Sequence, residues 1–240
     1  MSEGLADHQL DLGLDPNARA GEQLLLDLPK LSGSGRSDVV VSNSNAVASA
    51  HLDAWPDWPQ PLTVLSGPAG SGKTHLARCW AQRVGADTFD PRALADVSLG
   101  DQPFLIEDVD RGGLDERALF HVINAARARG LTGLLTARFR PGVWRVGLPD
   151  LLSRLAAAVQ IEVEQPDDVL VAGVAMTLFA ERQLEVGTDV IDTIVSRSPR
   201  SLVEVQALVR RLDYLSLTKR RAVTRPLVLE ALRLEAGSSR

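Results

Sequence analysis

The sequence predicts an α/β protein in which a parallel sheet carries a P-loop and a small C-terminal helical domain follows. Three observations support this fold class. Segments typical of strands and helices alternate as far as Glu164, which favours a parallel sheet with helices on both faces. The segment GPAGSGKT lies between an apolar strand and a helix, as a P-loop requires. After Pro166 only helical patterns remain.

Hydrophobic periodicity and turn residues place the elements of the α/β part. The first helix is followed by the proline-rich loop PDWPQP, and Gly130 ends a later helix. The expected strands are at 39–42, 62–67, 86–90, 104–107, 131–136 and 159–164, and the expected helices are at 45–55, 73–84, 91–97, 115–130 and 149–158.

The composition divides the chain into three parts. Residues 1–36 hold one compact apolar run, which is too little for a core, and we expect a flexible tail. Residues 37–165 form the α/β domain, and residues 166–240 form the helical domain. In the last part we expect helices at 167–183, 189–198, 199–217 and 225–236, with apolar residues at helical spacing for their core.

The overall composition excludes several classes of protein. With 45% hydrophobic and 24% charged residues in 240, the chain is expected to be globular. It has neither an apolar run of about 18 residues nor a basic, apolar leader, so a cytoplasmic protein without membrane contact is expected. Cys79 is the single cysteine, which excludes an intrachain disulfide and a multi-thiolate zinc site. The net charge of -5 argues against a dedicated nucleic-acid binder.

The motif at 67–74 predicts a nucleotide site. Its glycines let the backbone fold around phosphates, and backbone N–H groups at a helix start attract anions. Lys73 is expected to neutralise the β- and γ-phosphates, and Thr74 to bind Mg²⁺. The alternative is an ordinary glycine-rich turn. The residues expected to bind ADP or ATP are Gly67, Pro68, Ala69, Gly70, Ser71, Gly72, Lys73, Thr74, His75 and Arg200.

Three acids follow the strand expected at 104–107. Phosphoryl-transfer sites commonly use an Asp for Mg²⁺ and, where ATP is hydrolysed, a further residue that positions water. Here Glu107 is followed by Asp108, the reverse of the usual order, so we expect Glu107 to ligate Mg²⁺ and Asp108 to take the catalytic position. A misplacement of about 1 Å can cost about 10²-fold in rate. Weak or no intrinsic ATP hydrolysis is therefore expected, and solvated acids are the alternative, above all for Asp110.

Two polar residues are candidate phosphate sensors. Ser198 and Pro199 are suited to the start of a helix, which would put Arg200 in its first turn, where a facing phosphate would explain a cation. A surface arginine is the alternative. Thr136 ends a strand at the edge where open sheets bind ligands. It is a sensor candidate or a capping threonine, and Arg138 competes for the role.

Two further features suggest partners. Arg154 lies near the end of a helix and could act as an arginine finger on a neighbour's nucleotide, or form a surface salt bridge. In the tail, QLLLDLP could bind a hydrophobic groove of a partner or fold back on its own domain. Its expected contact residues are Gln23, Leu24, Leu26, Leu28 and Pro29, and QLDLGL at 9–14 is a weaker candidate.

The order of these parts resembles that of AAA+ ATPases with a helical lid. LPDLLSRL followed by VEQPDD, and the later TKRRAVTRPLVLEAL, are similar to segments of the replication initiator DnaA and above all of its shortened relatives, the Hda family. Hda proteins begin with a QLxLPL-type peptide that binds the DNA polymerase sliding clamp. QLLLDLP is similar, with one extra residue before the proline. The resemblance runs from Gln23 to about Leu234.

The resemblance implies a role in replication control. Nucleotide-bound Hda, chiefly with ADP, docks on the DNA-loaded clamp and stimulates ATP hydrolysis by DnaA through an arginine finger, which prevents over-initiation. It implies that Arg154 is the finger, Arg200 is sensor 2 and Thr136 lies in the sensor 1 region, where Arg138 replaces an acid of DnaA relatives. No helix-turn-helix domain and no sequence-specific DNA binding are expected, and a homo-oligomer is left open.

Two other functions remain as alternatives. An ATP-driven helicase loader or DnaA-like ATPase would fit the P-loop and the acids, but the chain lacks a basic stripe for DNA. A small-molecule P-loop phosphotransferase fits less well, because no set of residues for an acceptor is visible.

Overall fold

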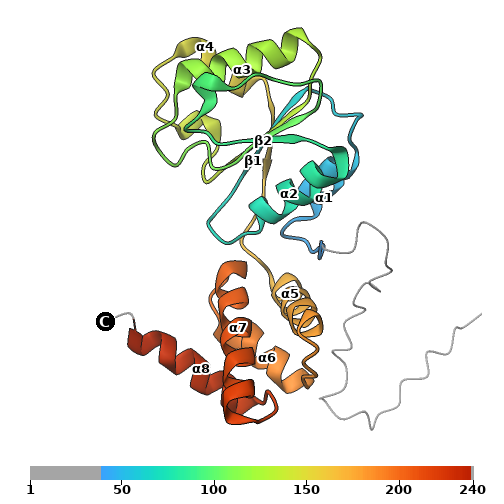
Figure 1. Cartoon of the computed structure of the whole chain (residues 1–240), viewed down its shortest axis with the longest axis vertical. Helices are drawn as coiled ribbons and strands as arrows, with labels where there is room; N and C mark the ends of the chain where they lie inside the picture. The colour runs from blue at the N-terminus through green and yellow to red at the C-terminus, as the bar shows by residue number, and fades with distance from the viewer. Residues whose placement is uncertain (1–38, 239–240) are drawn as a thin grey trace, which may run out of the picture. The chain divides into compact units, whose positions relative to one another are not determined.

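The computed structural model describes residues 39–238, with side chains described as far as Leu234 (Figure 1). The predicted clamp peptide at 23–29 and the weaker candidate at 9–14 lie outside the described residues. Within the described part, no helix has the length and apolar character needed to cross a membrane.

Five parallel strands form one sheet in the order β2-β3-β4-β1-β5. The chain leaves β1 towards the β4 side of the sheet and later returns to place β5 on its other side. The carboxyl end of β1 is therefore a switch point, where open parallel sheets bind ligands. The strands are β1 (Leu62–Ser66), β2 (Asp87–Phe89), β3 (Phe104–Ile106), β4 (Gly133–Ala137) and β5 (Val159–Glu162).

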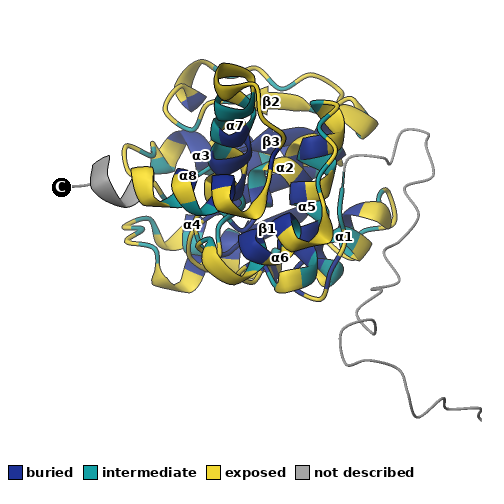
Figure 2. Ribbon diagram, turned by 90° about the horizontal axis from the view of Figure 1, so that it is seen from below, coloured by how far each residue is buried: buried dark blue, intermediate teal, exposed yellow. Residues whose placement is uncertain are grey.

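Helices cover both faces of the sheet, as the predicted α/β class requires. On one face α1 (Ala46–Asp53) and α2 (Lys73–Val84) pack on alternate strand residues such as Leu65. On the other face α3 (Glu116–Ala128) and α4 (Pro149–Ala156) pack on the intervening residues (Figure 1). This alternation follows from the two-residue period of a strand. Figure 2 shows β1 and β3 buried and the edge strand β2 largely exposed.

Four helices follow the sheet and have a core of their own. They are α5 (Asp168–Glu181), α6 (Thr188–Arg197), α7 (Leu202–Lys219) and α8 (Arg225–Ser238). Phe179, Ile194, Val209 and Val228 are each almost fully buried among them. The four helices confirm the predicted helical region, whereas the exact boundaries after residues 36 and 165 stay predictions.

Two predicted elements were wrong. Residues 39–42 do not join the sheet, because Ser42 N–H donates to Asn45 Oδ1 at 2.8 Å and Val40 packs on Gly173 of α5. Val40 thus packs against α5 and does not pair with a strand, and Val41 is exposed. Residues 91–97 form only a short 3₁₀ turn at Leu94–Asp96, which buries Leu94. The segment is too short to offset the free-energy cost of starting an α-helix.

Candidate nucleotide-binding site

The predicted P-loop joins the carboxyl end of β1 to the start of α2. Gly67, Gly70 and Gly72 have φ angles of 150°, 77° and 93°, a region that side chains other than hydrogen disfavour. A Cβ on Gly67 would overlap the carbonyl oxygen of Val163, which follows β5. The loop is therefore built in close backbone contact with the neighbouring strand, and only glycine fits at its first position.

The side chain of Lys73 turns back into this loop. Its Nζ donates to the carbonyl oxygens of Gly67 at 2.6 Å and Pro68 at 2.8 Å, and to Ser71 Oγ at 3.3 Å. Lys73 is 7% exposed. The loop thus holds a buried ammonium group at its centre, where it can attract a phosphate.

The charge of Lys73 is not fully compensated. Burial lowers the pKa of its ammonium group below the ordinary value, Asp108 and Asp110 act in the opposite direction, and Arg138 lowers the pKa further. A group whose charged form is disfavoured by burial gains most from an opposite charge nearby. A phosphate bound in the loop would therefore stabilise the charged form of Lys73.

The start of α2 adds to the attraction for anions. The helix has no acidic residue in its first turn, and its N-cap, Gly72, offers no side chain to the free N–H groups. These groups and the helix dipole favour a phosphate at this end. Thr74 is half-buried in the first turn, and His75 is exposed and contacts Cys79 on the same helix.

The three predicted acids lie together after β3, but each is bonded differently. Oε2 of Glu107 accepts hydrogen bonds from Arg78 Nε at 3.1 Å and Nη2 at 2.8 Å. Oδ2 of Asp108 pairs with Arg111 Nη1 at 2.8 Å. Two of the three acids are thus paired with arginines that the sequence analysis did not single out.

The third acid, Asp110, holds the chain after β4. Its carboxylate accepts hydrogen bonds from the N–H of Arg138 at 2.8 and 3.0 Å and from the N–H of Phe139 at 2.8 Å. A carboxylate that accepts backbone N–H bonds in this way fixes a turn. Asp110 is therefore placed to support the loop that follows the predicted sensor 1 residue, Thr136.

One oxygen near the P-loop has no partner. Glu107 Oε1 is buried and accepts no hydrogen bond from the described residues. A buried, unpaired carboxylate oxygen is costly unless a cation or water meets it. This chemistry fits the predicted Mg²⁺ ligand set of Thr74 and Glu107, since hard cations prefer oxygen ligands.

Thr136 is fully buried at the end of β4 and links the acids to the sheet. Its Oγ1 accepts a hydrogen bond from the N–H of Asp108 at 2.9 Å, and its carbonyl accepts one from Val109 at 3.0 Å. Asp108 has a φ of 54°, so the hydrogen bond that its N–H donates to Thr136 helps to hold a turn that Asp tolerates better than most residues. Thr136 thus holds the turn that follows β3, and its role as a sensor stays a prediction.

The predicted position of Arg200 in the first turn of a helix was wrong. The helix α7 begins at Leu202, and its N-cap is Ser201, whose Oγ accepts the N–H of Glu204 at 3.5 Å. Ser198 instead ends α6, where its Oγ donates to Ile194 O at 2.6 Å. Arg200 lies before α7 and pairs with Asp168 at the start of α5. Its sensor 2 role stays a prediction.

The start of α7 touches the P-loop directly, which the sequence analysis missed. The N–H of Leu202 donates to Gly70 O at 2.8 Å. A Cβ on Gly70 would lie 2.8 Å from Ser201 Cβ and 3.1 Å from Ser201 Cα. The sequence contained one usable signal, because Ser201 and Glu204 have the spacing of a capping box and mark the true helix start.

Gly70→Ala is expected to loosen this contact. The added methyl group would collide with Ser201, so the hydrogen bond from Leu202 to Gly70 would open more often. Hydrogen exchange of the Leu202 amide should accelerate about fivefold or more, since one hydrogen bond contributes ~1 kcal/mol. Gly85→Ala is the matched control, because Gly85 has a φ of 68° with open space around it. Equal Leu202 exchange in both variants would contradict the prediction.

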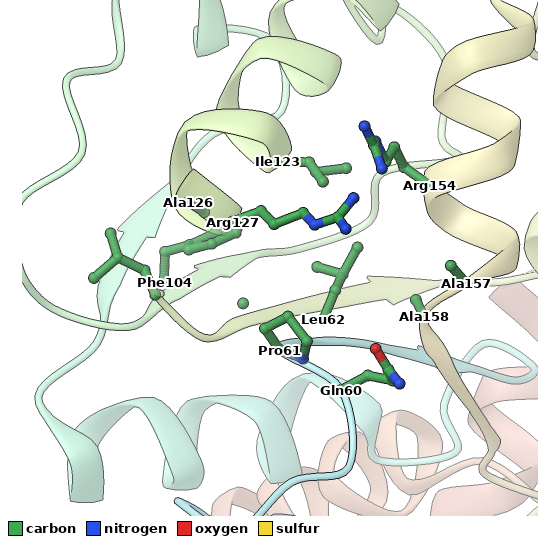
Figure 3. Close-up of a pocket in the computed structure, with 12 residues that line it drawn as sticks. Gln60, Pro61, Leu62, Phe104, Ile123, Ala126, Arg127, Arg154, Ala157 and Ala158 are labelled. Carbon is green, nitrogen blue, oxygen red and sulfur yellow. The ribbon is translucent and has the colours of Figure 1, made fainter. Parts of the chain in front are cut away.

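The predicted finger, Arg154, lies on α4 away from the P-loop. It borders a cavity with Leu62, Phe104 and Gly133, the first residues of β1, β3 and β4 (Figure 3). Its side chain has no hydrogen bond or ion pair with another described residue. The P-loop follows the opposite end of β1, and five residues of strand separate the two ends by ~13 Å. The structure does not bring Arg154 and the P-loop of the same chain together.

Comparisons with known proteins concern the fold of the chain and its helical lid. The family model of the Hda lid domain matches residues 175–232. Domain III of the replication initiation protein DnaA from Thermotoga maritima has a TM-score of 0.68 and 17% identity, with 81% of this chain and 93% of that chain covered. Residues 175–232 are thus similar to the Hda lid domain, and the fold of the chain is similar to that of DnaA domain III. The predicted AAA+ fold with a helical lid and the resemblance to Hda are thereby confirmed.

Two further solved structures and one sequence relative are also similar to this chain. The Holliday junction branch migration motor RuvB of Thermotoga maritima has a TM-score of 0.63 and 18% identity, with 80% of this chain and 68% of that chain covered. A DnaA structure bound to AMPPCP and single-stranded DNA has a TM-score of 0.59 and 17% identity, with coverages of 80% and 69%. An uncharacterized protein of Haemophilus influenzae is 26% identical over 197 residues, 74% of this chain and 84% of that protein.

Proposed function

We propose that this chain is a nucleotide-binding regulator of replication initiation. It binds ADP or ATP with Mg²⁺, docks on the DNA polymerase sliding clamp through 23–29 and stimulates ATP hydrolysis by DnaA through Arg154, which prevents over-initiation. The Hda-type lid at 175–232 and the likeness to DnaA domain III support the family of this function.

The position of Arg154 is the single observation that carries the proposal. Its guanidinium has no partner among the described residues and lies at the amino-terminal end of the sheet, across β1 from the P-loop of its own chain. An arginine finger supplied in trans to a GTPase accelerates hydrolysis by about 10³ to 10⁵. Arg154 is suited to such a role because it can meet only another molecule's nucleotide.

The P-loop side of the chain would bind its own nucleotide without fast turnover. The N–H groups at the start of α2 and the Lys73 ammonium hold the phosphates, and Thr74 with Glu107 would hold Mg²⁺, which neutralises phosphate charge when bound. The Asp108 carboxylate is engaged by Arg111, which leaves it poorly placed to activate water. This supports a resident nucleotide that acts as a structural ligand.

The clamp part of the proposal is tested with Gln23→Ala. ATP preloaded on DnaA is incubated with the DNA-loaded clamp and this chain, and released phosphate is measured. The intact chain should stimulate hydrolysis, and Gln23→Ala should lower the stimulation about tenfold, because one anchor residue of a short peptide carries a large share of its affinity. ADP binding by the variant serves as the control for folding.

The outcomes separate the parts of the proposal. No stimulation by the intact chain would overturn the regulatory role. The alternative, an ATP-driven helicase loader or DnaA-like ATPase, is favoured by the intact P-loop with Lys73 and Thr74, and it requires ATP hydrolysis that rises with single-stranded DNA. Equal stimulation by Gln23→Ala and the intact chain would exclude only the proposed clamp docking through 23–29.

A further inference from the structure

A small cavity lies beside Arg154, between α3, α4 and the amino-terminal ends of three strands. Its volume is about 150 Å³, and most of its wall is apolar. Figure 3 shows Arg127 extending from α3 and Arg154 from α4 on the same side of Leu62. The other lining residues are Gln60, Pro61, Phe104, Ile123, Ala126, Leu131, Gly133, Ala157 and Ala158.

The two arginines at this cavity lack counter-charges. None of the lining residues is acidic, and the side chains of Arg127 and Arg154 have no hydrogen bond or ion pair with another described residue. Arg129, two residues after Arg127, differs: it bonds to Asp101 and to the carbonyl of Leu99. In a chain of net charge -5, this cavity is a local positive site that favours an anionic group.

The size of the cavity decides what kind of occupant it takes. Sites for small molecules and cofactors enclose roughly 300–1,000 Å³, whereas this cavity holds about 150 Å³. That space suits one apolar side chain. A side chain inserted in a pocket, with charged groups at the rim, is the common anchor of a protein interface.

We propose that this cavity anchors the partner whose nucleotide Arg154 approaches. A segment of that partner inserts one apolar side chain between Leu62 and Ala157, and an adjacent carboxylate pairs with Arg127 at the rim. The inference rests on the proposed function, because it assigns the cavity to the DnaA side of the interface. It explains why an apolar cavity and a second unpaired arginine lie beside the predicted finger.

The test measures affinity and not hydrolysis. Fluorescently labelled DnaA loaded with AMPPCP is titrated with the full-length chain. Ala157→Leu places a larger side chain at an exposed position in the cavity, and Arg127→Glu reverses the rim charge. Each variant should raise the Kd about tenfold. Arg117→Glu is the matched control, since Arg117 is exposed at the other end of α3 and should change the Kd less than about twofold.

Salt dependence separates the two parts of the anchor. The affinity of the intact chain for DnaA should fall as the salt concentration is raised. This salt dependence should be weaker for Arg127→Glu and the same as that of the intact chain for Ala157→Leu. Melting curves check that each variant is folded. If one variant does not fold, the other still decides, because they remove different contacts.

The possible failures are distinct. If the intact chain binds DnaA and both variants bind equally well, the anchor is wrong while the proposed function stands. If the variants alter self-association of this chain and leave DnaA affinity unchanged, the cavity serves a second copy and the proposal is overturned. If the intact chain does not bind DnaA, the proposed function itself fails.

Discussion

Replacing Arg154 by Ala is expected to lower the stimulated hydrolysis of DnaA-bound ATP by about 10³-fold, in line with arginine fingers supplied in trans. The effect should be confined to the reaction, because Arg154 has no ion pair to lose within the described structure. Leu151 and Leu155, the fully buried residues of α4, stay in place. The measurement is phosphate release from preloaded ATP-DnaA with the DNA-loaded clamp present.

Two controls decide whether this loss reflects a finger. Arg117→Ala removes an exposed arginine of α3 and should leave the rate unchanged. Arg154→Lys should restore only a small part of the rate, since lysine lacks the planar fork that binds phosphate oxygens in pairs. Full stimulation by Arg154→Ala would exclude the finger role and with it the central step of the proposed function.

Gly67→Ala is expected to have the largest effect on the nucleotide site itself. The residue has a φ of 150°, and the new Cβ would overlap the carbonyl oxygen of Val163. Backbone strain and overpacking each cost about 1–3 kcal/mol, so the free energy of unfolding should fall by about 2–6 kcal/mol. ADP binding should be lost, because the loop can no longer close beside β5. Denaturant unfolding and an ADP titration measure both effects.

The matched control for Gly67→Ala is Gly112→Ala. Gly112 has a φ of 90°, but no atom lies within 4 Å of its added Cβ. This variant carries backbone strain without a collision, so it should cost clearly less stability and leave ADP binding intact. Similar losses in the two variants would show that the contact with Val163 does not determine the loop.

Local patterns predicted most of the fold for identifiable reasons. The helix expected at 73–84 is observed as Lys73–Val84, because its apolar residues recur at helical spacing and glycines bound it on both sides. The strand predicted at 39–42 was wrong, because β-branched residues indicate extended backbone but do not show whether a neighbouring strand has a free edge. Pairing is decided by tertiary structure, and this segment packs on α5 instead.

The candidate site shows the same division. The P-loop could be found from the sequence, because one short segment contains its glycines, lysine and hydroxyl. The partners of its acids could not, since Arg78 is 29 residues from Glu107 and meets it only when α2 packs beside β3. The start of α7 was misplaced because Ser198 and Ser201 both suit a helix cap, and only the folded chain shows which one is used.

The hydrogen bond from the N–H of Leu202 to Gly70 O connects the helical lid to the P-loop. Binding at the lid and nucleotide binding in the P-loop can therefore influence each other through this bond. Suppose that nucleotide binding changes the stability of this bond, and that a partner protein binds the lid only when the bond is broken. The partner then changes the affinity for nucleotide by the same factor by which nucleotide changes the affinity for the partner, because coupling between two binding events is reciprocal. The affinity of the P-loop for nucleotide would thus depend on whether a partner is bound to the lid. The exchange of ADP for ATP could then be set from outside the chain without a change in either pocket.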